Sequence, residues 1–147
     1  MFVYRISLAR WAGALSGSGR PGRWNSAGQY VVYTASSRAL SCLEYLVHVG
    51  GERAFMRYKL TQIEIPDKCS RQIILPASLP ENWHRVQNYH LCQPVGDRWA
   101  DGLESLILMV PSAIISDEFN IIINPAHPQF SQVKISEIKD FTFDQRL

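Results

Sequence analysis

Two unbroken apolar segments, SLILMVP at 105–111 and FNIIINP at 119–125, constrain the fold of this chain more than any other feature. A short continuous apolar run that ends at a proline is typical of a strand buried on both faces, since an exposed face would place polar residues at every second position. The two runs therefore predict buried strands in a mostly β core.

Other periodic segments add strands and at least one helix to this core. Ser36 or Ser37 can cap a helix that ends at the glycine pair 50–51. A helical turn is expected at 82–85, a second short helix at 97–102, and strands at 3–6, 29–34, 56–65, 72–75 and 133–143. With 147 residues, no internal repeat and no low-complexity linker, the chain is expected to form one α+β domain over 1–147.

Gly17, Gly19 and Gly22 match the G-x-G-x-x-G pattern of dinucleotide-binding turns. That pattern works when a strand precedes the glycines and a helix follows them, because the pyrophosphate then sits at the helix N-terminus. Here ARWAGALS precedes and RWNSAGQ follows, and the first clear strand comes only afterwards. We therefore reject a Rossmann fold, and the long loop before residue 29 is a candidate for function.

Charge and cysteine content exclude several classes of function. A net charge of +2 with scattered basic residues leaves no electrostatic footprint for nucleic acid. Cys42, Cys69 and Cys92 are odd in number and far apart, as expected in a reduced cytoplasm, and no apolar run reaches membrane-spanning length. The histidines at 48, 84, 90 and 127 lack metal-ligand spacing, so we expect no metal. Together, these observations predict a cytoplasmic protein that binds neither nucleic acid directly nor a membrane.

A polar stripe marks the predicted helix. Ser37, Ser41, Glu44 and His48 are spaced by four, three and four residues, which places them on one side of an otherwise apolar and, we expect, deeply packed helix. Such a stripe faces either solvent or a pocket. It carries a single carboxylate and no Lys or Arg, so a Glu44 half sunk among leucines is a candidate for charge stabilisation or acid–base work.

The loop offers a second group of candidates. Arg23 follows Gly22, where a guanidinium can approach a phosphate closely and grip it with two hydrogen bonds. Trp24 can offer a flat face to a base or pack in the core, and Tyr33 in the strand VVYTA can line a site or simply pack.

Ser112 follows the buried run at 105–111, so its hydroxyl can stand at the rim of a cleft or serve an ordinary turn. The chain has no G-x-S-x-G that would make this serine a hydrolase nucleophile. His127 lies near two prolines and is interpreted as a turn residue rather than the partner of a catalytic serine.

Four blocks taken in order resemble one family. GRWNSAGQYVVYTASSRALSCLEYLVH, GDRWADGLESLILMVPSAI, EFNIIINPAHPQF and FTFDQRL are similar to the blocks of the RES domain, which is named for an arginine, a glutamate and a serine. The resemblance runs from residue 4 to the C-terminus. It departs at Pro21, where the family often has a glycine.

The resemblance implies roles for particular residues. Arg23, Glu44 and Ser112 correspond to the three name-giving residues, and Tyr33 to a further active-site residue. These four are the expected catalytic residues. The residues expected to contact NAD+ are Arg23, Trp24, Tyr33 and Asn124.

The resemblance further implies a fold similar to that of ADP-ribosyltransferase toxins and the role of toxin in a bacterial type II toxin–antitoxin pair. NAD+ would be the substrate, cleaved with release of nicotinamide and transfer of ADP-ribose to water, phosphate or a protein, which arrests growth. No cofactor would be permanently bound. The partner would be an antitoxin with an Xre-like helix-turn-helix domain, and a homodimer within that complex is compatible with the resemblance. The alternative is a non-catalytic, RES-like partner-binding module.

Overall fold

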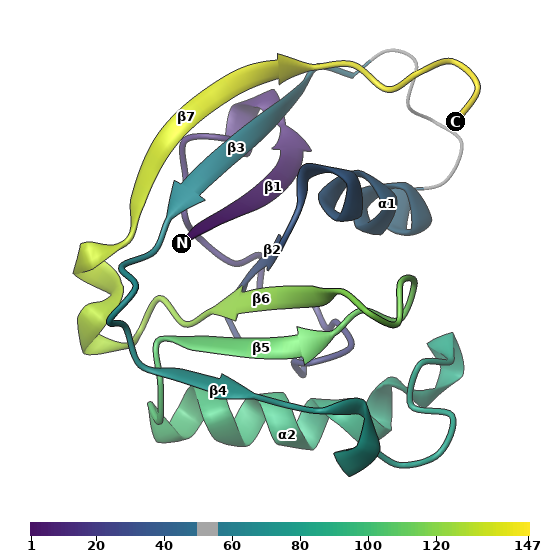
Figure 1. Ribbon diagram of the computed structural model, residues 1–147, viewed down its shortest axis with the longest axis vertical. Helices are drawn as coiled ribbons and strands as arrows, with labels where there is room; N and C mark the ends of the chain where they lie inside the picture. The colour runs from purple at the N-terminus through teal and green to yellow at the C-terminus, as the bar shows by residue number, and fades with distance from the viewer. Residues whose placement is uncertain (50–55) are drawn as a thin grey trace.

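The computed structural model describes residues 1–49 and 56–147, which form one curled sheet of seven strands with two α-helices beside it (Figure 1). The α+β class predicted from the sequence is confirmed. In chain order the elements, with η marking short 3-10 helices, are β1 Phe2–Leu8, η1 Ala9–Trp11, β2 Val32–Ala35, α1 Arg38–Val49, β3 Tyr58–Glu64, β4 Arg71–Ile73, η2 Pro76–Ser78, η3 Val86–Asn88, α2 Tyr89–Gly102, β5 Ile107–Pro111, β6 Phe119–Ile123, η4 Pro128–Gln132 and β7 Lys134–Phe141.

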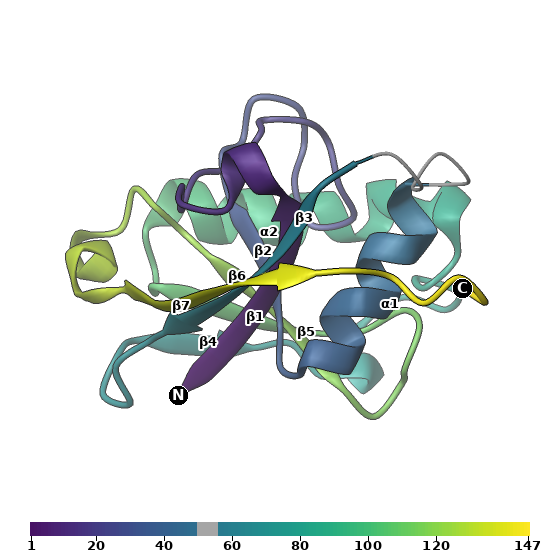
Figure 2. The same ribbon diagram turned by 90° about the horizontal axis from the view of Figure 1, so that it is seen from above.

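The strands are ordered β4-β5-β6-β2-β1-β3-β7, and every neighbouring pair is antiparallel except β4 with β5. Seen from above, β7 crosses β3 and β1 with α1 to one side of it (Figure 2). The central position of β6 and β2 brings the two halves of the chain together, so residues far apart in sequence share one surface.

β5 and β6 are buried on both faces, as their apolar sequences predicted. Ile107 and Ile121 contribute to one apolar cluster, whereas Leu108, Val110 and Ile122 contribute to another that α2 covers. All five side chains are fully buried. Side chains alternate across a strand, so a strand between two cores has no solvent face and needs no polar residues.

α1 is less buried than predicted. Ser37 caps it, with Oγ accepting a hydrogen bond from the Leu40 N–H at 3.0 Å, and Oγ of buried Ser41 accepts one from the Ile6 N–H of β1 at 3.0 Å. Val47, however, is 63% exposed. The expectation of a deeply packed helix was wrong, because α1 lies against β1 and β2 at the edge of the fold rather than between two layers.

The predicted strands and helices match the structure in most places, with shifted boundaries. The strand expected at 29–34 is β2 Val32–Ala35, and the strand expected at 56–65 is β3 Tyr58–Glu64. The helical turn expected at 82–85 is a turn that directly precedes the 3-10 helix η3. The expected end of the first helix at 50–51 lies outside the described residues.

α2 is longer than the short helix expected at 97–102. It begins at Tyr89, and its middle contains Pro94 and Gly96, which weakened the helical pattern in the sequence. Tertiary packing explains why residue 96 is a glycine, because a Cβ added there would lie 1.8 Å from the backbone oxygen of Trp24. The helix therefore packs directly on the backbone of the long loop.

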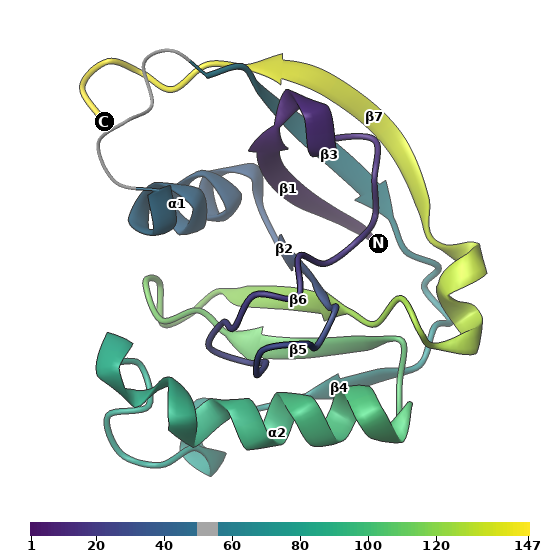
Figure 3. The ribbon, with the colours of Figure 1, turned by 180° about the vertical axis from the view of Figure 1, so that it is seen from behind.

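That loop, residues 12–31, lies across β5 and β6 and against α2 (Figure 3). Three α2 side chains four residues apart hold it through hydrogen bonds of 2.5–2.9 Å: Gln93 donates to Gly22 O, Asp97 accepts from Ser26, and Asp101 accepts from Gln29. After Gly22 the loop contains an isolated bridge to Asn25 and turns, with no helix, in agreement with rejection of the Rossmann fold.

Candidate active site

Glu44 projects from α1 toward the end of the sheet where β5 and β6 turn. Its Oε1 accepts two hydrogen bonds, one from the Ser112 hydroxyl at 3.0 Å and one from Asn120 Nδ2 at 2.5 Å. The side chain is half-buried. Both hydrogen bonds end on Oε1, so the carboxylate is held in one orientation. Oε2 takes part in neither of them.

The Ser112 hydroxyl is itself oriented. Its Oγ accepts hydrogen bonds from the backbone N–H groups of Ile114 and Ile115 at 3.1 and 3.2 Å. A hydroxyl whose lone pairs are occupied in this way has its hydrogen left to donate, and here that hydrogen points to Glu44. The turn after β5 therefore builds a directed chain of hydrogen bonds that ends on the carboxylate.

Strand register explains why these groups meet. Tyr33 of β2 lies opposite Ile122 of β6, and Asn120 lies opposite Val110 of β5. Directly paired residues share a face, and so do residues two apart on one strand, so Tyr33, Asn120 and Ser112 project from the same face. Diagonal neighbours in such a ladder are about 7–8 Å apart, within reach of one small ligand.

The Tyr33 hydroxyl connects the sheet to the GRWN loop, which is residues 22–25 of the long loop. It donates to Asn25 Oδ1 at 2.7 Å and accepts from the Trp24 N–H at 3.0 Å. Gly22 is required beside it, because a Cβ there would lie 2.8 Å from the Tyr33 oxygen. Burial raises the pKa of Tyr33 above its ordinary value of 10.0, partly offset by the hydrogen bond from Trp24.

Replacing Tyr33 with phenylalanine should lower the free energy of unfolding by about 1–3 kcal/mol, because the Trp24 N–H loses its acceptor. The wild type should also lose stability as pH rises beyond about 10. The pKa of Tyr33 is raised in the folded state, so above that pH ionisation favours the unfolded chain. Urea unfolding at pH 8 and near pH 11 measures both effects, since Tyr33→Phe removes this part of the pH dependence. Tyr30→Phe, at a 64% exposed tyrosine, is the control, and an equal effect there would contradict the prediction.

Arg23 lies in the same loop, but in this structure its guanidinium contacts protein carbonyls. Nη1 donates to the backbone oxygens of Trp83 and Arg85 at 2.6 and 3.1 Å, and Nη2 donates to that of His84 at 2.9 Å. The guanidinium carbon lies 4.6 Å from the ring centre of Tyr89. Arg23 thus ties the loop to the turn before α2, and its grip on a phosphate stays a prediction.

A cavity of about 310 Å³ is lined by residues that belong to the hydrogen-bonded group around Glu44 and by residues of the turn that Arg23 contacts. Trp83 and His84 line it from the turn that Arg23 holds, and Ser112 and Ile114 line it from the β5–β6 turn. Glu44 is hydrogen-bonded to one wall and Arg23 to the other. Ser112 therefore lines the hollow directly, whereas Glu44 and Arg23 are each connected to it through a hydrogen-bonded residue that lines it.

Trp24 and Asn124 have packing roles in this structure. Trp24 is 3% exposed, which corresponds to the alternative of a core residue rather than an open stacking face. Asn124 is equally buried, donates to the Ala100 oxygen at 3.0 Å and accepts from the Ala126 N–H, at the end of β6 away from Asn120. Contact of these two residues with NAD+ stays a prediction, and we do not include them in the site proposed below.

Sequence reasoning missed Asn120 and Trp83. A signal for Asn120 was present in the sequence. It is a polar residue inside the largely apolar run FNIIINP, and alternation along a strand places it on the same face as Ile122. Only the pairing of β6 with β5 shows that this amide faces Glu44. Trp83 lies in a turn without a periodic pattern, and no sequence signal marked it.

Removing the amide of Asn120 should weaken catalysis without loosening substrate binding. Asn120→Ala deletes one donor to the carboxylate, and a hydrogen bond to a charged group is worth about 1.5–3 kcal/mol, so kcat should fall roughly tenfold or more with KM little changed. In Asn120→Asp two carboxylates would share one site, so kcat should fall further at neutral pH and recover as pH is lowered. Steady-state rates across pH test this, with exposed Gln145→Ala as control. Unchanged kcat in both variants would contradict the role.

No group of three or more His, Cys, Asp or Glu side chains in the described ranges could hold a metal ion. Within those same ranges, neither helix is long and apolar enough to cross a bilayer.

Comparison with known proteins identifies the family. The model of the RES domain matches residues 2–144. The chain is 39% identical over 149 residues to a protein named Toxin Res from Pseudomonas putida, covering 100% of this chain and 99% of that protein. A Toxin Res from Yersinia enterocolitica is 35% identical over 153 residues, with the same coverage. A protein named Prs ADP-ribosylating toxin from Sphingobium sp. is 37% identical over 138 residues, covering 90% of this chain and 86% of that protein. These matches along its length show that the chain belongs to the RES domain family of toxins.

Proposed function

We propose that this protein is a toxin that consumes NAD+ by breaking the bond between nicotinamide and ribose. As the C–N bond breaks, its electron pair moves to the nicotinamide nitrogen and positive charge develops on the ribose, as in glycoside cleavage. A carboxylate fixed near the sugar stabilises that charge without reorganising. The observation that carries the proposal is the Glu44 carboxylate, held through Oε1 by Asn120 and by Ser112, the latter a residue that lines a cavity.

The other residues have supporting roles in this proposal. Ser112 and Asn120 orient Glu44, and Tyr33 lies on the same face of the sheet, near the ribose or nicotinamide. The acceptor of the ADP-ribosyl group is water, phosphate or a protein side chain, which loses a proton as it bonds to the ribose carbon. The name of the Sphingobium relative, an ADP-ribosylating toxin, supports NAD+ as substrate.

The alternative was a module that only binds partners. That function requires no convergence of Arg23, Glu44 and Ser112, whereas an enzyme does. Ser112 lines the cavity, and Glu44 and Arg23 are each hydrogen-bonded to a residue that lines it, which supports the enzyme. In the cell we further propose that an Xre-like helix-turn-helix antitoxin restrains it in the cytoplasm and that unrestrained activity arrests growth.

The test is to incubate purified, partner-free protein with NAD+ and to quantify released nicotinamide with and without phosphate and with added protein acceptors. Release that needs phosphate identifies a phosphorylase, release in buffer alone a glycohydrolase, and labelled protein a transferase. No release under any of the three conditions would overturn the proposal.

A further inference from the structure

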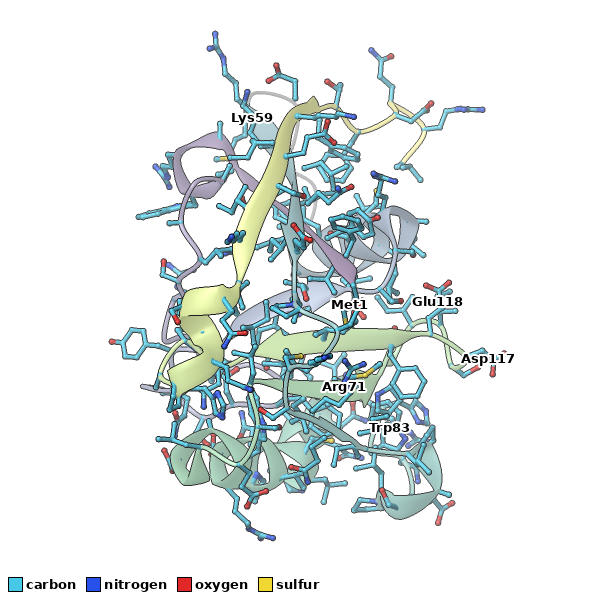
Figure 4. All side chains as sticks on the ribbon, turned by 60° about the vertical axis from the view of Figure 1, so that its left-hand side comes forward. Met1, Lys59, Arg71, Trp83, Asp117 and Glu118 are labelled. Atoms are coloured by element: carbon cyan, nitrogen blue, oxygen red, sulfur yellow. The ribbon has the colours of Figure 1, made fainter. Side chains whose placement is uncertain are left out.

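An indole ring lines the cavity beside Ser112. Trp83 and Ser112 both border this hollow of about 310 Å³, and Figure 4 shows Trp83 at the same side of the molecule as Asp117 and Glu118 of the β5–β6 turn. Trp83 is half-buried and leans on the core ring of Trp24, with 6.1 Å between ring centres. Trp83 is the larger of the two aromatic side chains that line this cavity, the other being His84, whereas Trp24 is buried.

Arg23 controls where this ring stands. Its hydrogen bonds to the carbonyls at 83, 84 and 85 fix three consecutive peptide groups, and its guanidinium carbon lies 5.8 Å from the Trp83 ring centre. The turn that carries the ring begins near Asn82, which has a positive φ of 60°. Asparagine adopts this left-handed conformation readily, and Arg23 holds the turn that follows it through three contacts from a residue about 60 positions away.

We infer that Trp83 is the stacking face for the nicotinamide ring of NAD+ and that Arg23 is the residue that positions it; this inference rests on the proposed function. Glu44 acts at the bond to nicotinamide, and Ser112 links it to the cavity, so the group beside Trp83 is nicotinamide rather than adenine. Oxidised nicotinamide is a planar cation, which an indole face attracts more strongly than any other side-chain ring. After cleavage the ring is neutral, so the attraction favours substrate over product.

The inference predicts a specificity that a merely structural tryptophan would not have. Reduced NADH carries an uncharged, puckered ring, so a site that stacks the cation binds NAD+ at least tenfold more tightly than NADH. ADP-ribose has no nicotinamide and does not use Trp83. Stacking of a ring on an aromatic side chain typically changes affinity roughly ten- to hundredfold when the side chain is removed.

The experiment measures, by calorimetry, the Kd of NAD+, NADH and ADP-ribose for a Glu44→Gln protein, in which cleavage is slow enough for binding to be measured. In this background Trp83→Ala should raise the Kd of NAD+ tenfold or more, remove the preference over NADH and leave the Kd of ADP-ribose unchanged. Trp83→Phe should keep most of the preference. Trp11→Ala, at a 54% exposed tryptophan, is the matched control. If Trp83→Ala left the NAD+ to NADH ratio intact, or weakened all three ligands equally, the inference would be wrong.

Arg23 separates two roles in the same assay. If Arg23 acts through Trp83, Arg23→Gln weakens NAD+ and spares ADP-ribose; if it grips the pyrophosphate instead, both ligands weaken and the positioning role is wrong. Thermal unfolding identifies variants that do not fold. If Trp83→Ala or Arg23→Gln does not fold, the same Kd measurements on Trp83→Phe and Arg23→Lys test the inference. The proposed function is judged separately, because it fails only if the wild type releases no nicotinamide, whereas this inference fails with an active wild type.

Discussion

Replacing Glu44 with glutamine should lower kcat for NAD+ cleavage by roughly a hundredfold or more, with KM little changed. Loss of preorganised electrostatic stabilisation typically has an effect of this size, since it acts on charge that develops only in the transition state. Glutamine keeps an oxygen that can accept from Ser112 and Asn120, so the side chain retains its place and only the negative charge is lost. Initial rates of nicotinamide release over a range of NAD+ concentrations measure both parameters.

The same substitution should abolish growth arrest when the protein is expressed without an antitoxin. Its melting temperature should match that of the wild type, because the hydrogen bonds to Ser112 and Asn120 are conserved in kind. Ser112→Ala is a useful companion: it removes one donor but keeps the charge, so its kcat should lie between those of wild type and Glu44→Gln. Full NAD+ cleavage by Glu44→Gln would show that the assigned chemistry is wrong, even within a correctly assigned family.

Gly96→Ala should destabilise the fold by about 3 kcal/mol or more, at or above the upper end of the usual cost of overpacking. The added Cβ would stand 1.8 Å from the Trp24 carbonyl oxygen, and the contact is with backbone, so no side-chain rotation can relieve it. Either α2 or the GRWN loop must move, and the loop carries Arg23. For a domain of this size the melting temperature should fall by roughly 10 °C.

Calorimetric melting measures this effect, and Gly13→Ala provides the matched control. A Cβ at Gly13 meets no other atom within 4 Å, so that substitution should leave the melting temperature nearly unchanged. Any Gly96→Ala protein that remains folded should also cleave NAD+ poorly, because Arg23 and the turn at 83–85 shift together. A melting temperature equal to that of the wild type would mean that α2 is not seated on the loop backbone.

The sequence was informative about elements whose local pattern and tertiary environment agree. The apolar runs at 105–111 and 119–125 became β5 and β6, because a strand buried on both faces must be apolar throughout. The same logic failed for α2, where Pro94 and Gly96 lower helix propensity. Tertiary packing overrides that preference, since only a glycine lets the helix approach the Trp24 carbonyl.

From residue type and spacing, the sequence alone predicted the α+β class and the buried strands. Through its resemblance to the RES domain it also predicted the family and gave the candidates Arg23, Glu44, Tyr33 and Ser112. Tertiary structure alone decided which polar groups meet. Asn120 lies near the start of β6, where strand pairing brings its amide to the Glu44 carboxylate. Asn124 directly follows β6 and is buried at the opposite end of the strand. Likewise, folding buries Trp24 and leaves Trp83 at the cavity. Such contacts join residues some 60 to 76 positions apart, and no local pattern encodes them.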